Sequence, residues 1–232
     1  MGYREMLLSI IIPVYNEELT IGNVIDRTKD AARQIGYPYE IIVINDLSYD
    51  NSLQVAVQRK VRVYSLREHL GKGYALRAGF AQARGDVIIT IDSDGSHWPE
   101  ELAEVLTPVL DNSADMVIGS RYLNHKHVEA RKLNKFGVRI FNYLIQLFTG
   151  VAITDSQSGY RAMKREVLNI QKLNSGGYEI ESEMLVKTAK AGFRLAEVPI
   201  TFEQRTYGCS GVDPVVDGSK IMFSIITAYL KG

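Results

Sequence analysis

The sequence has little cysteine and no excess of charge of either sign. Cys209 is the only cysteine among 232 residues, which excludes an internal disulfide and a cysteine-based zinc site and is typical of a reducing compartment. Because 27 Lys and Arg residues balance 27 Asp and Glu residues, the chain lacks the overall positive field that recruits nucleic acid. We therefore expect no nucleic-acid partner, and any basic site must be local.

Long hydrophobic runs are also missing. The N-terminal run reaches Pro13 after a few residues, which is too short for a signal peptide or a membrane span. The C-terminal segment KIMFSIITAYLKG (220–232) covers roughly half of the ~20 residues that a spanning helix needs. We expect that this segment can lie on a membrane surface but cannot cross a bilayer by itself.

The apolar residues, 46% of the chain, instead form short runs that alternate with helical patterns. Continuous apolar runs predict buried strands over residues 7–15, 39–46, 61–66, 86–92 and 115–121. Helical spacing predicts helices between them, the first with Asn16 as its N-cap. This alternation indicates an α/β fold with a mostly parallel central sheet and helices on both faces.

Polar side chains gather where these strands end. Ligands of such sheets bind beyond the carboxyl ends of the strands, so these residues mark a candidate site. They are Asn16, Glu17, Asn45, Asp46, Arg67, Asp92, Asp94 and Arg121. No Gly-x-Gly-x-x-Gly motif follows the first strand, which disfavours a dinucleotide-binding fold of other chemistry.

The second half of the chain is less regular. It predicts a helix over 132–150, a polar loop that becomes a helix over 154–168, and a helix over 178–192 that ends at Gly192. A strand is predicted over 193–202, and the polar, glycine-containing segment 203–218 is typical of a mobile loop.

The stretch VIITIDSDGSHW ends a buried strand on two aspartates, Asp92 and Asp94. Residues i and i+2 of an extended segment point the same way, so both carboxylates should face one point. A divalent cation such as Mg²⁺ or Mn²⁺ between them would offset their repulsion. An Asp-x-Asp motif also serves as a turn or helix cap, which leaves that alternative open. His97 is a candidate further ligand, although a single His beside Trp98 is more often a packing residue.

Six motifs follow one another along the chain: SIIIPVYNEE, VINDLSYDNS, GKGYALRAGF, IDSDGSHWPEEL, GSRY and SQSGYRA. Together they resemble glycosyltransferase family 2, which has the GT-A fold, and especially its dolichyl- and polyprenyl-phosphate mannose synthases. The resemblance covers nearly the whole chain. It implies one GT-A domain over 1–232, with a Rossmann-like nucleotide-sugar-binding half (1–121) and an acceptor-binding half (122–232).

The resemblance also implies an activity. We expect an inverting, metal-dependent transferase that moves a hexose, first of all mannose from GDP-mannose, to a polyprenyl or dolichyl phosphate. The alternatives are UDP-glucose or UDP-N-acetylglucosamine as donor, a saccharide acceptor, or a non-catalytic nucleotide-sugar-binding module. A base carboxylate near Asp155 would favour a saccharide acceptor, whereas a basic, apolar-lined groove would favour the lipid.

The donor site is assigned by the same resemblance. Contacts to the nucleotide sugar are expected from Pro13, Tyr15, Glu17, Asp46, Lys72, Asp92 and Ser93. Lys72 should lie near the donor diphosphate, where Gly71 and Gly73 would let the backbone approach closely. Asn45 and Leu47 depart from the family's Asp-Asp-Gly pattern. With Leu47 in place of glycine, the sequence does not determine the local backbone conformation.

The expected metal ligands are Asp92, Asp94 and Ser96, of which Ser96 stands where many mannose synthases have Gln. Asp94, Arg121 and Arg205 are the expected catalytic residues. A polyprenyl phosphate is already ionised, so it needs cations that orient it more than it needs a base. Further acceptor contacts are expected from Arg131, Lys135, Arg139, Asp155 and Ser158.

Two groups of these residues have an alternative reading. The basic residues between 131 and 139 could equally form a solvated helix face. Glu179, Glu181 and Glu183 are either surface or capping residues of a helix, or acids near the donor sugar.

The resemblance implies a peripheral enzyme on the cytoplasmic side of the membrane, or a cytoplasmic one if the acceptor is soluble. Some relatives carry C-terminal membrane anchors, and the sequence leaves open whether this chain lacks them naturally.

Replacing Asp94 tests the assignment of the metal pair. We expect Asp94→Ala to abolish metal-dependent sugar transfer, because one of two carboxylate ligands is lost, while the fold survives. Transfer assays with Mg²⁺ or Mn²⁺, together with the circular dichroism spectrum of the variant, check both points. Near-normal turnover would remove the metal-pair interpretation.

Overall fold

A seven-stranded sheet forms the centre of the protein in a computed structural model that describes residues 5–123, 132–169, 172–205, 207 and 213–231. The strands are β1 (Leu8–Val14), β2 (Tyr39–Asn45), β3 (Arg62–Ser65), β4 (Val87–Thr90), β5 (Met116–Ser120), β6 (Arg161–Lys164) and β7 (Leu195–Pro199). The helices are α1 (Ile21–Ile35), α2 (Ser52–Gln58), α3 (Lys72–Gln82), α4 (Leu102–Leu110), α5 (Lys132–Thr149), α6 (Arg165–Asn169), α7 (Ile180–Lys190) and α8 (Val216–Lys231), with a short 3₁₀ helix, η1 (Pro99–Glu101), before α4.

The order of the strands is β3-β2-β1-β4-β6-β5-β7. All neighbouring strands are parallel except β6, which runs antiparallel to both β4 and β5. The mostly parallel sheet that the sequence predicted is therefore confirmed. The chain moves from β1 to β2 and β3 on one side and then returns to place β4 on the other side of β1, so the strand order reverses between β1 and β4. Ligands of open α/β sheets bind at such a reversal.

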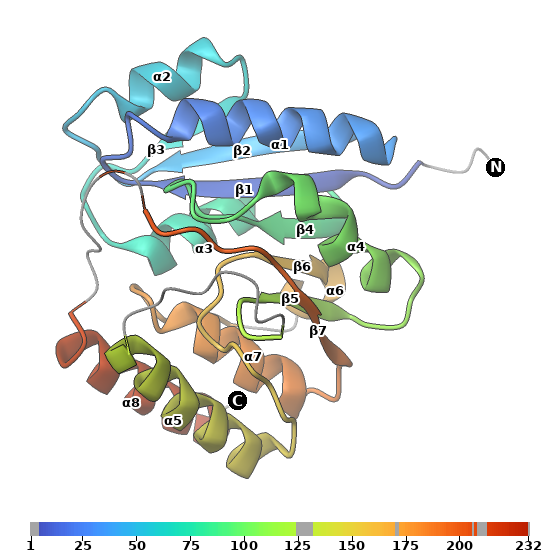
Figure 1. The fold of residues 1–232 in the computed structure, drawn as a ribbon, viewed down its shortest axis with the longest axis vertical. Coiled ribbons are helices and arrows are strands. Elements are labelled where there is room, and N and C mark those ends of the chain that lie inside the picture. Colours follow the sequence, from blue (N-terminus) through green and yellow to red (C-terminus); the bar gives the residue numbers. More distant parts are fainter. Residues whose placement is uncertain (1–4, 124–131, 170–171, 206, 208–212, 232) are drawn as a thin grey trace.

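Helices cover both faces of the sheet, as expected (Figure 1). Leu8, Ile10 and Ile12 alternate along β1 and pack in one core with α1 and α4, whereas Ile11 belongs to a second core with α3, α7 and α8. α5 packs against α7 and α8 on the second face, where Figure 1 shows α5 and α8 side by side. None of the described helices combines the length and the apolarity needed to cross a bilayer.

Strand β6 corrects the prediction of a loop and one helix over residues 154–168. The segment RAMK is only four residues long and contains no β-branched residue, so its own sequence does not favour a strand. It becomes one because it pairs on both sides, with β4 and β5. Because β6 is antiparallel, the loop that precedes it lies at the same edge as the carboxyl ends of β4 and β5. This places Asp155 and Ser158 near the strand ends of the first half.

Helix α1 begins later than predicted. Its N-cap is Thr20, not Asn16. Asn16 lies in a turn with a positive φ of 54°, and its side-chain oxygen accepts the backbone N–H of Tyr49 at 3.0 Å. Asn tolerates this left-handed conformation, so residue 16 ends the strand segment instead of starting the helix. The predicted end of α7 is confirmed, since Gly192 has a φ of 79° directly after the C-cap Ala191.

Arg161 of β6 is fully buried and joins three segments around the strand ends. Its guanidinium donates to the carbonyl oxygens of Ser158 (2.8 Å), Ser156 (2.8 Å) and Glu181 (2.7 Å). Burial lowers the pKa of Arg161 to about 10, which still leaves the side chain charged at neutral pH. Arg161 thus holds the loop before β6 against the first turn of α7.

Arg161→Met should lower the free energy of unfolding by about 3 kcal/mol or more, because three buried carbonyl groups lose their donors. Arg161→Lys should have a free energy of unfolding between those of the wild type and Arg161→Met, since a compact ammonium cannot span three separate carbonyls. Arg33→Met, at an exposed position on α1, is the matched control and should change stability by less than about 0.5 kcal/mol. Denaturant unfolding curves measure all three. An Arg161→Met protein as stable as the control variant would contradict this role.

Candidate active site

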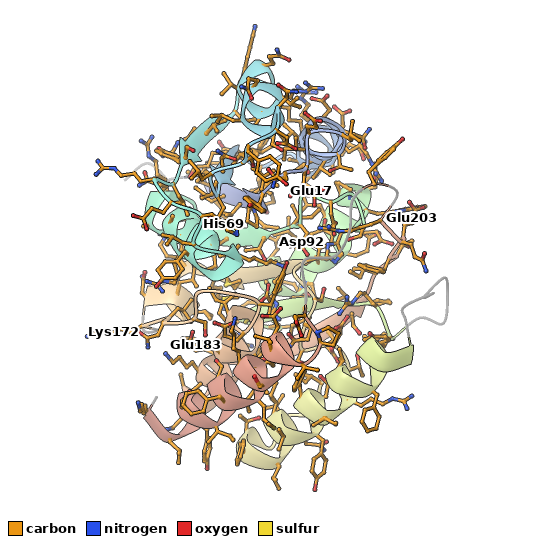
Figure 2. All side chains as sticks on the ribbon, turned by 90° about the vertical axis from the view of Figure 1, so that its left-hand side faces the viewer. Glu17, His69, Asp92, Lys172, Glu183 and Glu203 are labelled. Atoms are coloured by element: carbon orange, nitrogen blue, oxygen red, sulfur yellow. The ribbon has the colours of Figure 1, made fainter. Side chains whose placement is uncertain are left out.

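Loops at the carboxyl edge of the sheet carry the residues that the sequence singled out. Figure 2 shows Glu17, His69 and Asp92 on this side of the molecule. The loops after the parallel strands contribute residues 15–17, 46–47, 69–72, 92–97 and 121, and the loop before β6 contributes residues 154–160. The topology therefore brings together residues that are far apart in the sequence.

Lys72 lies between two carboxylates. Its Nζ is 2.6 Å from Oδ1 of Asp92 and 2.9 Å from Oε1 of Glu181 in the first turn of α7. Burial lowers the pKa of Lys72, but the two carboxylates raise it above its ordinary value, so the ammonium stays charged. Lys72 is thus no solvated loop lysine. Glu181 and Glu183 are buried as well, so they are not helix-surface residues.

The loop before β6 approaches Asp92 closely. A Cβ atom added to Gly159 would lie 2.6 Å from both carboxylate oxygens of Asp92. Only glycine therefore fits at this position of the SGYR motif. Gly73 has a similar role, since its Cβ would lie 2.5 Å from the carbonyl oxygen of Ser175. We expected the missing side chain of Gly73 to leave room for a ligand, but the backbone of residues 175 and 176 occupies that space. The N–H of Gly73 donates to the carbonyl oxygen of Gly176 at 2.8 Å.

Arg205 joins a second pair of carboxylates. Its Nε lies 2.8 Å from Oδ2 of Asp94, and its Nη2 lies 2.7 Å from Oε1 of Glu17. Burial would raise the pKa of Asp94, but the nearby His97 ring and hydrogen bonds from Ser96 and Arg205 lower it to about 2. Burial raises the pKa of Glu17. Arg205 thus ties the loop after β7 to the loops after β1 and β4.

Each aspartate of the Asp-x-Asp motif has a cation of its own in this structure, although both also lie near His97. The segment turns at Ser93 and Asp94 instead of staying extended, so the rule for i and i+2 side chains of a strand does not apply. Asp92 binds Lys72 and Asp94 binds Arg205. Ser93 is buried, and the hydroxyl of Ser96 donates to Asp94 at 2.6 Å. In this structure the repulsion between the aspartates is offset by two side-chain cations.

These ion pairs form one cluster, which we call the carboxylate cluster: Glu17, Asp92, Asp94 and Glu181 with Lys72 and Arg205. When its four carboxylates are ionised, its two cations leave two negative charges unbalanced. That excess fits one divalent cation. No group of three His, Cys, Asp or Glu side chains among the described residues is arranged to hold a metal. Mg²⁺, however, commonly takes one or two carboxylates and completes its shell with water and substrate phosphates.

His97 lies beside this cluster and is only 2% exposed. Its Nδ1 is 3.8 Å from Oδ2 of Asp92, and neither ring nitrogen has a hydrogen-bond partner among the described residues. Burial lowers the pKa of His97, so the ring is neutral at pH 7. A buried, neutral imidazole with an unpartnered nitrogen next to Asp92 is a suitable further ligand, and its ring also packs against Tyr160 and Phe202.

A second group of side chains surrounds Asp46. Both carboxylate oxygens of Asp46 accept backbone N–H groups, from Leu70 at 2.9 Å and Gly71 at 2.8 Å. His69 adds a contact of 2.8 Å between its Nδ1 and Oδ2 of Asp46, and its ring stacks on Tyr15 with centroids 3.8 Å apart. No sequence motif marks His69, because this stacking joins loops after two different strands.

The backbone at residue 47 adopts a left-handed conformation that usually favours glycine. Leu47 adopts a positive φ of 56°. Its side chain is 46% exposed beside Tyr49, so apolar groups rim this part of the site. Pro13, in contrast, is buried within β1, where it is paired with Ile44 of β2.

Arg121 and Asp155 form a separate ion pair. The carboxylate of Asp155 accepts Nε of Arg121 at 2.6 Å, Nη2 at 2.7 Å and the backbone N–H at 3.0 Å. Asp155 has no exposed surface, and the guanidinium lies 5.0 Å from the ring centroid of Phe202. The two residues, which the sequence placed in different motifs, thus act as one unit.

Of the other predicted acceptor residues, the structure describes the side chains of Ser158 and Arg139. Ser158 is fully buried, and its hydroxyl accepts the N–H of Tyr160 at 3.4 Å. Arg139 is exposed on α5, which fits the alternative of a solvated helix face. Lys135 lies in α5 without a described side chain, and Arg131 and Cys209 lie outside the described residues.

Two similar proteins have names that state an activity. A polyprenol monophosphomannose synthase of Mycolicibacterium smegmatis is 35% identical over 239 residues, which cover 96% of this chain and 87% of that protein. A UDP-N-acetylglucosamine–dolichyl-phosphate N-acetylglucosaminyltransferase of Methanococcus voltae is 29% identical over 246 residues, 96% of each chain.

A similar solved structure is the glucosyl-3-phosphoglycerate synthase from Mycobacterium tuberculosis in complex with Mn²⁺, UDP and phosphoglyceric acid. Its TM-score is 0.74 at 22% identity, and the match covers 97% of this chain and 78% of that one. Another crystal structure of that enzyme contains Mg²⁺ and UDP. The likeness shows the same GT-A fold. Residues 9–170 match the family model of glycosyl transferase family 2, and this chain therefore belongs to that family of glycosyltransferases.

Proposed function

We propose that this enzyme transfers a hexose from a nucleotide sugar to the phosphate group of a polyprenyl or dolichyl lipid, with inversion at the anomeric carbon. One observation carries the choice of acceptor: the carboxylate that a saccharide acceptor would need near Asp155, and the four of the carboxylate cluster, are each paired with a Lys or Arg side chain. Arg205 holds Glu17 and Asp94, Lys72 holds Asp92 and Glu181, and Arg121 holds Asp155. A hydroxyl acceptor needs a carboxylate that can take its proton. A phosphate is ionised already and needs none.

Asp155 is the clearest case. A saccharide acceptor would be favoured by a base carboxylate near this residue, but Asp155 is buried and binds Arg121 through both oxygens. Arg121 and the neighbouring Phe202 instead provide a cation beside an aromatic ring. This combination suits a phosphate group that is attached to an apolar chain.

The two named relatives support a lipid phosphate as acceptor and differ in the sugar. One is named for a polyprenol and mannose, the other for dolichyl phosphate and N-acetylglucosamine. We propose mannose from GDP-mannose as the first candidate, with UDP-N-acetylglucosamine or UDP-glucose as the alternative. Tyr15, His69 and Asp46 form the surface on which either base would be recognised.

We further propose that Asp92 and Asp94 hold Mg²⁺ or Mn²⁺ with the donor diphosphate, with His97 or Ser96 as a further ligand. The two unbalanced negative charges of the carboxylate cluster support this. The cation would neutralise charge on the leaving nucleoside diphosphate. Lys72 and Arg205 would add positive charge beside the donor phosphates, and Arg121 would orient the acceptor oxygen in line.

The arrangement of the sheet supports one catalytic domain over residues 1–232. β6, from the proposed acceptor half, lies between β4 and β5 of the proposed nucleotide-sugar half. The two halves therefore share one sheet and cannot separate without breaking its central ladder.

A panel of radiolabelled nucleotide sugars tests donor, acceptor and metal together. Each donor is incubated with Mg²⁺ or Mn²⁺ and a short polyprenyl phosphate, and label in the organic phase is counted. We expect label from one donor, and its loss on addition of a chelator. Release of nucleoside diphosphate without labelled lipid, or transfer to a free saccharide, would contradict the proposed acceptor.

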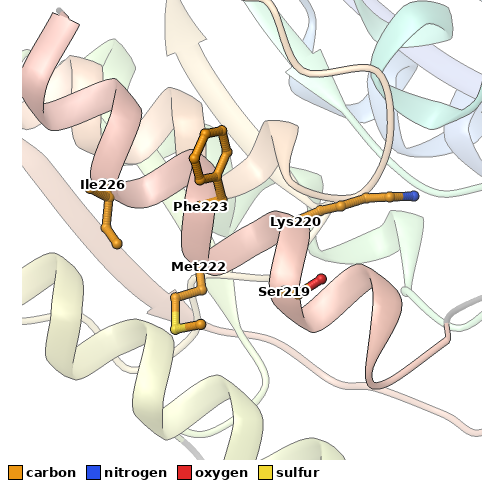
Figure 3. Close-up of a pocket in the computed structure, with 5 residues that line it drawn as sticks. All are labelled: Ser219, Lys220, Met222, Phe223 and Ile226. Carbon is orange, nitrogen blue, oxygen red and sulfur yellow. The ribbon is translucent and has the colours of Figure 1, made fainter.

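The membrane surface is the second proposed partner. α5 and α8 bury one apolar face in the core and leave a second apolar face exposed. Its side chains are Phe136, Ile140, Tyr143 and Leu147 on α5 and Met222, Phe223, Ile226 and Leu230 on α8. Lys220 belongs to the same stretch of α8, where it lines a surface pocket together with Ser219, Met222, Phe223 and Ile226 (Figure 3). Exposed aromatic and apolar residues next to a cation suit the interface of an anionic bilayer, and we propose a peripheral location on its cytoplasmic side.

Phe223→Asp should weaken binding to vesicles of anionic phospholipid, because a charge replaces an inserted ring. Val57→Asp, at an exposed apolar position on α2, is the matched control and should bind like the wild type. Co-sedimentation with vesicles measures both. Equal binding of the two variants would contradict this surface, and a concentration-dependent dimer lost in Phe223→Asp would show that a second copy covers it instead.

A further inference from the structure

Glu197 of β7 binds the loop that carries Asp155 through two hydrogen bonds. Its Oε2 accepts the backbone N–H of Thr154 at 2.7 Å, and its Oε1 accepts the backbone N–H of Asp155 at 2.9 Å. Burial raises the pKa of Glu197, because the carboxylate lies below the surface next to Asp155. Both of its oxygens are therefore committed to this loop and not to a ligand.

Other side chains hold the same loop at different atoms. Asn142 of α5 donates to the carbonyl of Thr154 at 2.7 Å and accepts the N–H of Ser156 at 3.1 Å. The hydroxyls of Ser120 and Thr154 lie 2.6 Å apart. Among these side chains, only Glu197 contacts the backbone of Asp155 itself. Glu197 therefore fixes the position of the Asp155 backbone, from which the carboxylate side chain extends.

Asp155 in turn fixes the direction of Arg121. A guanidinium is planar, and two parallel hydrogen bonds to one carboxylate leave it a single orientation. Nε and Nη2 form those bonds, at 2.6 Å and 2.7 Å. Within the described part of the chain, Nη1 of Arg121 makes no hydrogen bond. It lies on the side of the guanidinium that faces away from Asp155. The ring of Phe202 lies 5.0 Å from the guanidinium carbon.

We infer that Glu197 is a positioning residue for the acceptor. It fixes Asp155, Asp155 orients the guanidinium of Arg121, and the outward Nη1 edge then binds the acceptor phosphate. Glu197 has no contact with either substrate in this arrangement. The inference rests on the proposed function for the identity of the acceptor, but the link from Glu197 to Arg121 holds for any anionic acceptor at this edge.

Glu197→Gln replaces one accepting oxygen by an amide that donates, so one of the two backbone N–H groups loses its partner. We expect KM for the polyprenyl phosphate to rise about tenfold, because Arg121 is no longer held in one orientation. KM for the nucleotide sugar and the affinity for nucleoside diphosphate should change less than about twofold, since the carboxylate cluster is untouched. Glu166→Gln, at an exposed position on α6, is the matched control and should leave all three values unchanged.

The position of Arg121 can be followed without any substrate. The ¹H–¹⁵N resonance of Arg121 Nε, assigned by its absence in Arg121→Lys, reports the hydrogen bond to Asp155. We expect it to shift and exchange faster with water in Glu197→Gln but not in Glu166→Gln.

Equal increases of both KM values in Glu197→Gln, or a lower Tm with unchanged kinetics and an unchanged Arg121 resonance, would overturn the inference. Wild-type protein that transfers no sugar to the lipid would instead contradict the proposed function. In that case the Arg121 resonance still decides whether Glu197 positions the arginine.

Discussion

The site depends on the neutralisation of carboxylates that the fold gathers at one edge of the sheet. Glu17, Asp92, Asp94 and Glu181 are mostly withdrawn from water, where like charges repel strongly and lose hydration. Lys72 and Arg205 each bridge two of them, so the loops after β1, β4 and β7 and the start of α7 are connected electrostatically. Two negative charges remain. The resting protein is thus held together by the same groups that a cation and a donor diphosphate would engage.

The antiparallel strand β6 makes this gathering possible. In a purely parallel sheet the segment before a strand lies at the amino edge, away from the ligand. Because β6 reverses direction between β4 and β5, the loop before it reaches the carboxyl edge and brings Asp155 and Gly159 there. Gly159 touches Asp92, and Asp155 binds Arg121. Arg161 then anchors that loop to α7. One short strand therefore connects the carboxylate cluster with the Arg121–Asp155 pair.

The sequence predicted the first half of the fold well, because long apolar runs and helical spacing are local signals. It also placed Asp92, Lys72 and Arg205 at one site through their motifs. It failed where partners on distant segments decide the structure. RAMK forms a strand only because two neighbours pair with it, and the partners of the two aspartates, Lys72 and Arg205, come from distant segments. His69 and Glu197 carry no motif, since their roles arise from contacts with other loops.

The ion pairs between carboxylates and cations in the site also limit the kind of chemistry that the site can perform. An enzyme that activates a hydroxyl must leave one carboxylate unpaired, at a cost in stability, so that it can accept a proton. Here both oxygens of Asp155 accept hydrogen bonds from Arg121, so neither is free to accept a proton from a hydroxyl. What the pair offers is a guanidinium of fixed direction, which suits a nucleophile that already carries negative charge. The same ion pair that stabilises the loop before β6 is thus the structural basis for proposing an anionic acceptor.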